Sequence, residues 1–290
     1  IYGVCKLRSA YAGSAVRLTR VSDSTTQDVG FGANGCIDGE SGDSFCVGTT
    51  CYITTWYDQS GSALDATGTT TNGPVWNRTA TINGTRVLTF GSVHNSTTNM
   101  SAVARYLTLP AGLVWTPSSS SFFMVGKNTN TKQATIINAF LMNAAGTRGF
   151  GNGFNYSGMT TIGVGTACST TVPASPAVWG FTMSSSVMTC YAGNQSGTAV
   201  YTSQSSSNGG TIGSTTASQS GVFDLQALVM WTSTLNSTDA QSVLGSLSSQ
   251  FGIPFQGDEV WIVDGDSMSM GHGSIYANNW PKLTAPFLRY

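Results

Sequence analysis

A serine with the surroundings of a nucleophile lies near the carboxyl end of the sequence. The apolar run Val260–Asp264 predicts a buried strand, and Gly265, Asp266 and Ser267 follow it directly. A serine at a turn between a strand and a helix exposes its hydroxyl, and its backbone amide can help to form an oxyanion hole. Ser267 is therefore a candidate nucleophile.

Carboxyl pairs, which glycoside hydrolysis requires, are scarce in this sequence. No Asp or Glu occurs between Asp65 and Asp224, and the sequence holds two glutamates, Glu40 and Glu259. Most glycosidases use one carboxyl group as acid and a second as nucleophile or base, and neutral side chains do not replace them at ordinary rates. The middle of the chain is therefore not expected to cleave glycosidic bonds.

Four consecutive residues, Trp56, Tyr57, Asp58 and Gln59, could bind a glycan. The aromatic rings could stack on sugar rings, and Asp58 and Gln59 could bond sugar hydroxyls. The alternative is structural, because aromatic residues fill β-sheet cores and an aspartate commonly caps its own turn. No Cys-x-x-Cys pair occurs and the chain has two histidines, so we predict neither a metal nor a cofactor.

The elements that must position these residues are mostly strands. Short apolar or alternating runs, separated by clusters of Gly, Asn, Ser and Thr, predict an all-β sandwich or barrel. Of these we predict the sandwich, in a jelly-roll arrangement. The runs are 15–19, 51–56, 86–90, 121–127, 135–140, 177–183, 187–191 and 222–231. The stretch 203–220, rich in Ser, Thr and Gly, predicts a long loop or a weak edge hairpin.

One helix is expected after the last run. Thr238 and Gln241 have the spacing of a capping box, and an apolar face with helical periodicity follows, until Gly252 and Pro254 end the helix. A change of character near residues 253–258 suggests a domain boundary. We therefore predict a sandwich over residues 1–253, and a linker with the start of a short α/β unit over residues 254–290.

Composition limits the partners and the compartment. Charged residues make up 9% of the chain and its net charge is -1, which offers no electrostatic footprint for nucleic acid. No apolar stretch is long enough to span a membrane. Six cysteines favour an oxidising compartment, and we predict the pairs Cys46–Cys51, Cys5–Cys36 and Cys168–Cys190 among 15 possible connectivities.

Seven Asn-x-Ser/Thr sequons are candidates for N-glycosylation if a eukaryotic host makes the protein. They are at Asn77, Asn83, Asn95, Asn99, Asn155, Asn194 and Asn236. The number is slightly above chance for a chain so rich in Ser and Thr. The sequence alone does not choose among them.

The string Ser44-Phe-Cys46-Val-Gly-Thr-Thr-Cys51, which runs into Trp56-Tyr-Asp58-Gln-Ser-Gly61, resembles the catalytic domain of arabinofuranosidase B. The resemblance covers roughly residues 2–253 and implies a concanavalin A-like sandwich with a sugar-cleaving site. In that family a Glu nucleophile follows a Tyr-Gly-Asn segment, and an Asp acid/base precedes the last strand. The corresponding stretches here, 150–156 and 212–217, contain no acid.

The segment from Val263 to Gly273, followed by Asn279-Trp-Pro, resembles the first block of an SGNH (GDSL-type) esterase. That resemblance implies a nucleophile at Ser267, next to Gly265 and Asp266. The family also needs a downstream Asp-x-x-His, and neither His94 nor His272 has an Asp three residues before it. An active esterase would therefore require sequence beyond residue 290.

These observations lead to three hypotheses. The first is a non-catalytic extracellular or virion-surface module, either structural, as a fibre, wall or surface-assembly subunit, or glycan-binding. Its partners would be glycans or copies of itself, and 2–8 and the tail after Phe255 are the segments expected to assemble. The second is an accessory domain of a secreted SGNH carbohydrate esterase, and the third is an active arabinofuranosidase. Each places the chain outside the cell or on a cell or virion surface.

Overall fold

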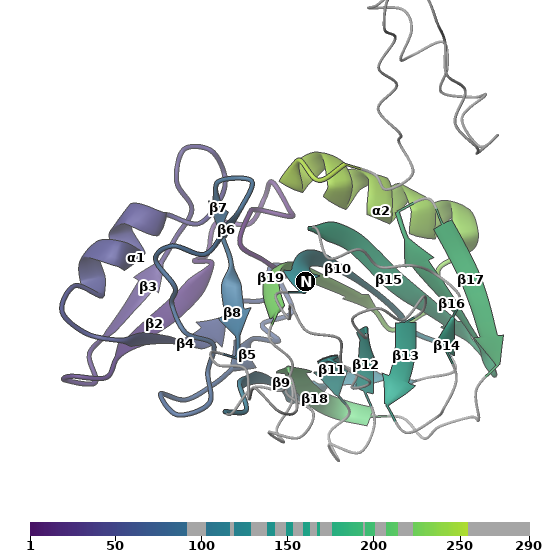
Figure 1. Ribbon diagram of the computed structural model, residues 1–290, viewed down its shortest axis with the longest axis horizontal. Coiled ribbons are helices and arrows are strands. Elements are labelled where there is room, and N and C mark those ends of the chain that lie inside the picture. The colour runs from purple at the N-terminus through teal and green to yellow at the C-terminus, as the bar shows by residue number, and fades with distance from the viewer. Residues whose placement is uncertain are drawn as a thin grey trace, which may run out of the picture.

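The architecture is two antiparallel sheets with two helices outside them (Figure 1). The computed structural model describes residues 1–91, 103–116, 119–128, 138–142, 149–152, 159–162, 167–168, 176–193, 195–200, 207–213 and 223–254. The prediction of an all-β sandwich is confirmed in this part of the chain.

The first sheet has seven strands and contains the most apolar runs of the sequence. Its order is β1-β19-β10-β15-β16-β17, with β8 also paired to β19. Their bounds are Tyr2–Gly3 (β1), Leu88–Phe90 (β8), Ser121–Asn128 (β10), Ala177–Ser184 (β15), Val187–Ala192 (β16), Gln195–Val200 (β17) and Phe223–Trp231 (β19). Seven consecutive residues are buried in β15 and again in β19, as expected of strands covered on both faces.

The second sheet has ten strands, in the order β14-β13-β12-β11-β18-β9-β5-β4-β2-β3. Their bounds are Val16–Arg20 (β2), Thr26–Val29 (β3), Cys51–Trp56 (β4), Ala66–Thr67 (β5), Tyr106–Trp115 (β9), Asn138–Met142 (β11), Gly149–Asn152 (β12), Met159–Ile162 (β13), Ala167–Cys168 (β14) and Ser207–Gly213 (β18). A separate hairpin joins β6 (Thr81–Ile82) to β7 (Thr85–Arg86).

The prediction that residues 203–220 form a loop or an edge hairpin is wrong for β18. This strand pairs with β11 on one side and β9 on the other, so it lies inside the ten-stranded sheet. Gly209 and Gly210, two of its three glycines, have positive φ values of 76° and 136° and lie where the register with β9 shifts. These two glycines therefore form an irregularity within a strand. The glycine-rich composition alone had suggested a loop.

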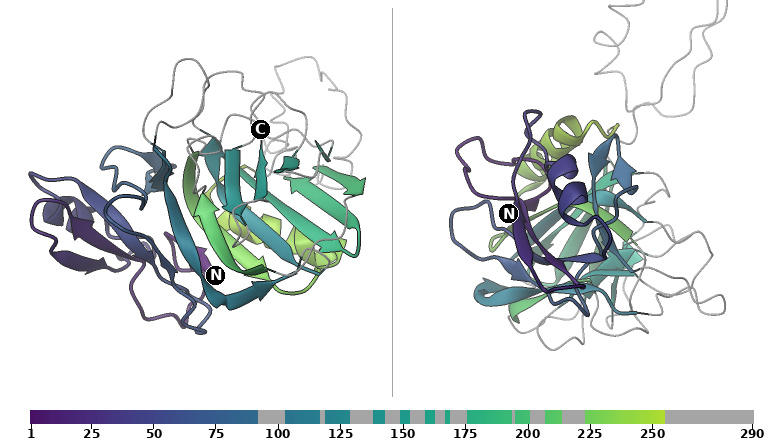
Figure 2. Two further views of the ribbon diagram at one scale, coloured as in Figure 1. Left: turned by 90° about the horizontal axis from the view of Figure 1, so that it is seen from below. Right: turned by 90° about the vertical axis from the view of Figure 1, so that its left-hand side faces the viewer.

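Helix α2 (Ser237–Phe251) contacts β15 and β10 of the seven-stranded sheet (Figure 2). Its apolar face is as predicted, but its N-cap is not. Asn236, two residues before Thr238, accepts a hydrogen bond from the amide of Asp239 at 2.9 Å. The helix ends at Gly252, whose φ of 61° is a left-handed conformation that a glycine adopts without strain.

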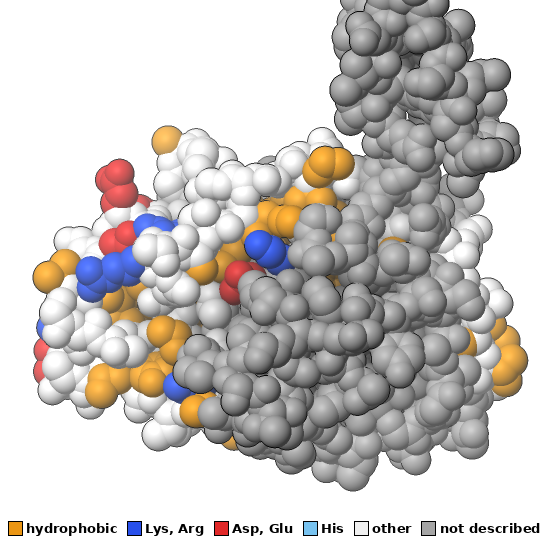
Figure 3. Space-filling view, viewed as in Figure 1, with side chains coloured by type: hydrophobic (Ala, Val, Ile, Leu, Met, Phe, Trp, Pro, Cys, Tyr) orange, Lys and Arg blue, Asp and Glu red, His pale blue; other side chains and the backbone are white. Residues whose placement is uncertain are grey.

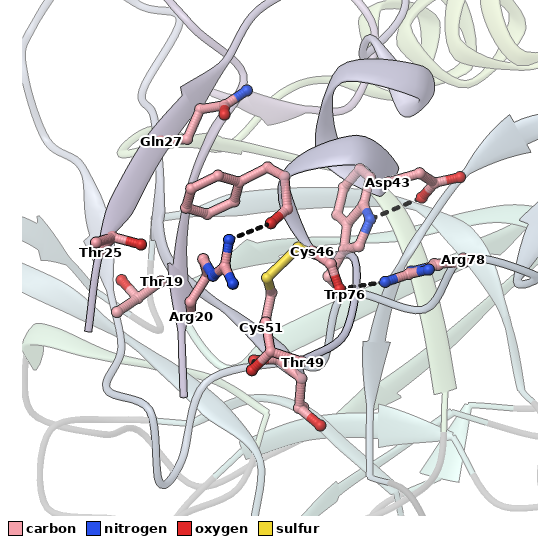
Figure 4. The surroundings of a disulfide bond; sticks show 12 residues. Thr19, Arg20, Thr25, Gln27, Asp43, Cys46, Thr49, Cys51, Trp76 and Arg78 are labelled. Carbon is pink, nitrogen blue, oxygen red and sulfur yellow. Dashed lines mark hydrogen bonds between the residues drawn. A yellow bond between two sulfur atoms is a disulfide. The ribbon is translucent and has the colours of Figure 1, made fainter. Parts of the chain in front are cut away.

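The short helix α1 (Gly39–Phe45) was not predicted from the sequence. Asp38 caps it by accepting a hydrogen bond from the amide of Ser41 at 3.0 Å. The helix leads into the Cys46–Cys51 disulfide, and Figure 4 shows the side chains that surround this bond. The Trp76 indole donates to Asp43 at 2.9 Å, and the guanidinium groups of Arg20 and Arg78 bond the carbonyls of Phe45 and Cys46.

The core between the sheets is aromatic and closely packed. Phe90 and Phe223 stack at 4.7 Å between ring centroids with an angle of 9° between their planes. A Cβ added at Gly213 would lie 3.0 Å from the Phe90 ring and 2.3 Å from the Arg105 carbonyl oxygen, so no side chain fits there. Full burial of each phenylalanine side chain contributes roughly 1.5–3 kcal/mol.

Candidate active site

The predicted glycan-binding turn follows directly from β4, and its carboxylate is fully engaged in the fold. Asp58 is 4% exposed and accepts hydrogen bonds from the Ile1 ammonium at 2.8 Å, the Ser60 amide at 2.9 Å and the Leu64 amide at 3.2 Å. Burial pulls the pKa of Asp58 upward, but the hydrogen bonds from the Ile1 ammonium and Ser60 outweigh it, so this pKa is lowered. Asp58 is therefore ionised and holds the turn.

Gln59 attaches the amino-terminal segment to this turn. Its amide nitrogen donates to the carbonyls of Gly3 at 2.8 Å and Cys5 at 3.1 Å, while its carbonyl oxygen accepts from the amide of Leu7 at 2.8 Å. The side chain has no exposed surface. In all three bonds, Gln59 takes the place of water as the hydrogen-bond partner of a backbone group. These backbone groups can therefore be buried without a large loss of free energy.

The two aromatic residues of the turn lie in different environments. Trp56 is fully buried and its ring packs 5.7 Å from that of Tyr2. Tyr57 reaches the surface, donates to Asp28 at 2.7 Å and lies beneath the Arg17 guanidinium. Trp56, Asp58 and Gln59 therefore hold the fold together, and of the four predicted residues Tyr57 alone lies near the surface.

Arg17, Asp28 and Tyr57 form a polar cluster on neighbouring strands. Arg17 donates two hydrogen bonds to the Asp28 carboxylate, at 2.7 and 2.9 Å. These bonds lower the pKa of Asp28. Partial burial acts in the opposite direction, and a hydrogen bond from Tyr57 adds a smaller lowering contribution. Both charges are exposed by 40% or more, so solvent weakens their attraction.

A carboxyl group whose pKa is raised, unlike those of Asp28 and Asp58, lies in the seven-stranded sheet. Asp224 is in β19, opposite Thr89 of β8 and Lys127 of β10, and is 8% exposed. Burial raises its pKa, although a hydrogen bond from Thr89 at 2.8 Å and the charge of Lys127 act against the rise. Among the described carboxyl groups whose pKa is shifted, Asp224 alone has a raised pKa, so it retains its proton most readily. This is the property that a general acid requires.

The other predicted site residues have these outcomes. Gly265, Asp266 and Ser267 lie outside the described residues, as does the rest of the tail after Phe255. Cys5–Cys36 and Cys46–Cys51 are disulfides, and Cys190 is also disulfide-bonded, whereas the side chain of Cys168 lies outside the description. In the described ranges, no group of three His, Cys, Asp or Glu residues could hold a metal ion.

Two further predictions concern assembly and membranes. Tyr2 and Gly3, from the segment expected to assemble with other copies, pair within the chain with Leu228 and Ala227 of β19. Tyr2 is 1% exposed. Across the described residues, no helix is long and apolar enough to cross a membrane.

Comparison with known proteins gives a family match in the amino-terminal part. Residues 3–92 match the family model described as alpha-L-arabinofuranosidase B, catalytic. A probable alpha-L-arabinofuranosidase B of Aspergillus flavus is 48% identical over 56 residues, which are 19% of this chain and 11% of that protein. The alpha-L-arabinofuranosidase B of Emericella nidulans is 44% identical over 62 residues, 21% of this chain and 12% of that protein.

Solved structures extend the fold similarity beyond the matched segment. A GH54 α-L-arabinofuranosidase soaked with a cyclic sulfate inhibitor superposes with a TM-score of 0.64 at 17% identity, over 86% of this chain and 62% of that one. An arabinofuranosidase complexed with arabinofuranosyl-α-1,2-xylobiose gives 0.63 at 15% identity, with the same shares covered. The chain thus shares their fold, and it spans less than two thirds of their length.

These findings overturn the first functional hypothesis. A non-catalytic structural or glycan-binding module was expected because the stretches corresponding to the catalytic acids of arabinofuranosidase B, 150–156 and 212–217, contain no Asp or Glu. The part of the chain with detectable sequence similarity nevertheless matches a catalytic domain, and the fold is that of arabinofuranosidases. Absence of acids at two expected places was therefore too narrow a reason to exclude catalysis. The findings do not favour the esterase alternative either.

Proposed function

We propose that this chain is a glycoside hydrolase domain that acts on α-L-arabinofuranosyl groups. The observation that carries the proposal is the match of residues 3–92 to the catalytic domain of alpha-L-arabinofuranosidase B. The arabinofuranosidase fold over most of the chain supports it. The substrate class follows from the names of these proteins, one of which is a complex with arabinofuranosyl-α-1,2-xylobiose.

Asp224 is the candidate proton donor of this proposal. Hydrolysis begins when an acid protonates the oxygen of the leaving group, and the acid must still hold its proton at the working pH. Burial between β8 and β10 gives Asp224 a raised pKa, and the Thr89 hydroxyl orients its carboxyl group. The second carboxyl group of the reaction must come from outside residues 66–223, which contain no Asp or Glu.

The proposed place of action is an oxidising compartment outside the cytoplasm. The disulfides Cys5–Cys36 and Cys46–Cys51 both lie in the segment that matches the family. Disulfides persist in secreted and cell-surface proteins and are rare where thiols are kept reduced. Hydrolysis of an external polysaccharide is consistent with this setting.

The test is release of 4-nitrophenol from 4-nitrophenyl α-L-arabinofuranoside, a compound soaked into a mutant GH54 enzyme of the same fold. We expect turnover of this compound by the folded chain. On an arabinofuranosyl-xylobiose, whose sugar leaving group needs a proton as 4-nitrophenolate does not, we expect a loss of roughly 10²- to 10⁴-fold in Asp224→Asn, the range attributed to general acid catalysis. Asp23→Asn, which changes an exposed acid in a turn, is the matched control and should retain activity. A chain with a cooperative melting transition but no turnover would refute the proposal.

A further inference from the structure

We infer that Asn77 and Asn236 carry N-linked oligosaccharides in the folded chain and that Asn83 does not, because the fold accommodates a sugar at the first two and not at the third. The inference concerns covalent modification and does not depend on the proposed hydrolysis. Three of the seven sequons, at these residues, lie in the described part of the chain. Their side-chain nitrogens have different surroundings, and this nitrogen is the atom to which a sugar attaches.

Asn83 has no free position for a sugar. It occupies the turn between β6 and β7 with a φ of 50°, followed by Gly84 at 77°, as an Asn-Gly hairpin turn requires. Its side-chain nitrogen donates to the carbonyls of Phe251 at 3.0 Å and Gly252 at 2.8 Å, at the carboxyl end of α2. An amide with two hydrogens is fully used by two acceptors, so a sugar would displace one bond and meet the helix end.

At Asn77 the side-chain oxygen, and not the nitrogen, makes the hydrogen bonds. Its side-chain oxygen accepts hydrogen bonds from the Thr79 amide and hydroxyl, both at 3.0 Å, and from the Ala80 amide at 3.2 Å. All three bonds hold the oxygen, and none uses the nitrogen. Arg78 and Thr79 are exposed, so the turn lies on the surface. The nitrogen of Asn77 is therefore available, and the sequon's own hydroxyl fixes the orientation of the amide.

Asn236 is also compatible with a glycan. It is exposed at the start of α2, where its oxygen accepts from the Asp239 amide at 2.9 Å and its nitrogen donates to the Asp239 carboxylate at 2.8 Å. One hydrogen of the nitrogen is used, and the second can be replaced without loss of the helix cap. A sugar attached there would extend into solvent.

The modification forms one bond and breaks another. The side-chain nitrogen bonds to C1 of the first sugar of a lipid-pyrophosphate-linked oligosaccharide, the bond from C1 to the pyrophosphate oxygen breaks, and one amide proton is lost. The donor belongs to the eukaryotic secretory pathway, so the inference applies to the chain made in such a host. A glycan added to Asn83 before folding would prevent the hairpin from bonding to α2.

The test is a peptide map of the chain secreted by a eukaryotic host and released with peptide N-glycosidase in ¹⁸O water, which labels each formerly glycosylated asparagine. We expect label at Asn77 and Asn236 and none at Asn83. The matched variants Thr79→Val, Thr85→Val and Thr238→Val each remove one sequon and keep its asparagine. The first and third should each lose one glycan in intact mass, and the second should lose none.

The wild-type peptide map decides the question even if a variant folds poorly. An Asn-Gly pair deamidates spontaneously, so the map is repeated without the glycosidase. Label at Asn83 that appears only with the enzyme would overturn the inference. An unlabelled Asn77 or Asn236 would overturn it as well. Loss of arabinofuranosidase activity would leave it unaffected, because none of the three residues belongs to the candidate active site.

Discussion

The amino-terminal region, residues 1–91, and the later region, residues 103–254, use different means to hold their strands. The first depends on two disulfides and on polar side chains that bond distant backbone groups, such as Gln59 with Gly3 and Cys5. The second depends on long buried strands such as β15 and β19. On the face in Figure 3, the visible charged side chains gather mostly over the amino-terminal region.

This difference explains where similarity to known proteins is detectable. Cross-links and buried polar contacts require particular residues at particular positions, because a partner left unpaired costs roughly 1–3 kcal/mol. A buried strand accepts many apolar residues of suitable size. The family match over residues 3–92 and the fold match at 17% identity follow this pattern. The first region therefore identifies relatives, while the second holds the candidate proton donor.

The largest effect should come from the disulfides and should depend on the loop that each one closes. Cys5 and Cys36 are 31 residues apart, and Cys46 and Cys51 are 5 apart. Loop-closure entropy predicts losses of about 4 kcal/mol for a Cys5→Ser/Cys36→Ser variant and about 2 kcal/mol for Cys46→Ser/Cys51→Ser. Denaturant titration of the three proteins measures both. Equal losses would mean that native-state packing, and not chain entropy, sets the contribution.

Replacement of Gln59 should cost about 3 kcal/mol, somewhat less than the longer disulfide. Gln59→Ala leaves the carbonyls of Gly3 and Cys5 and the amide of Leu7 without their partner inside the protein. Gln59→Glu is a sharper comparison, because it keeps the acceptor for Leu7 and loses the donor. Both variants can be followed by thermal denaturation. A loss below 1 kcal/mol would show that water reaches these groups.

The smallest effect should be on the pH dependence of stability, with opposite signs in the two regions. The folded pKa of Asp58 is lowered, so its contribution is complete above the ordinary aspartate pKa and is lost as pH falls through the lowered value. The folded pKa of Asp224 is raised, so its contribution is complete in acid and is lost as pH rises through the raised value. Urea titrations across the acid range should therefore give a stability maximum.

Two variants separate these contributions. Asp58→Asn should remove the fall in stability on the acid side, and Asp224→Asn should remove the fall on the side of higher pH. If the Asp224→Asn variant kept the wild-type profile, the environment of Asp224 would not favour its protonated form. The argument for Asp224 as a proton donor would then lose its physical basis.

Regular elements could be predicted from the sequence wherever local pattern and tertiary environment agree. The strand at 51–56 and the buried strands near 177–183 and 222–231 were predicted within a residue or so, because their runs are apolar and bounded by turns. Helix α1 was missed because Gly39, Glu40, Ser41 and Gly42 show no apolar periodicity, and an Asp38 cap is a weak signal. Strand β18 was missed because neighbouring strands on both sides stabilise a glycine-rich segment that looks like a loop in isolation.

The candidate site was harder to predict than the fold. The Trp56–Gln59 turn was identified, but no local pattern shows that Gln59 bonds residues more than 50 positions away. Asp224 had one available signal, an acid within a mostly apolar run. Its raised pKa depends on burial between β8 and β10, which come from distant parts of the chain. The sequence therefore indicates which acid is unusual, and only the fold explains why.

The pairing of Tyr2 with Leu228 also constrains the order of events during synthesis. The ribosome makes the amino-terminal strand first, yet its partner emerges more than 200 residues later. Contacts between such distant segments form slowly, because a long loop must close before they stabilise the chain. The nascent protein therefore carries β1 unpaired until β19 has been made. Because unpaired strands are prone to aggregation, we expect chaperones to assist the chain until β19 has been made.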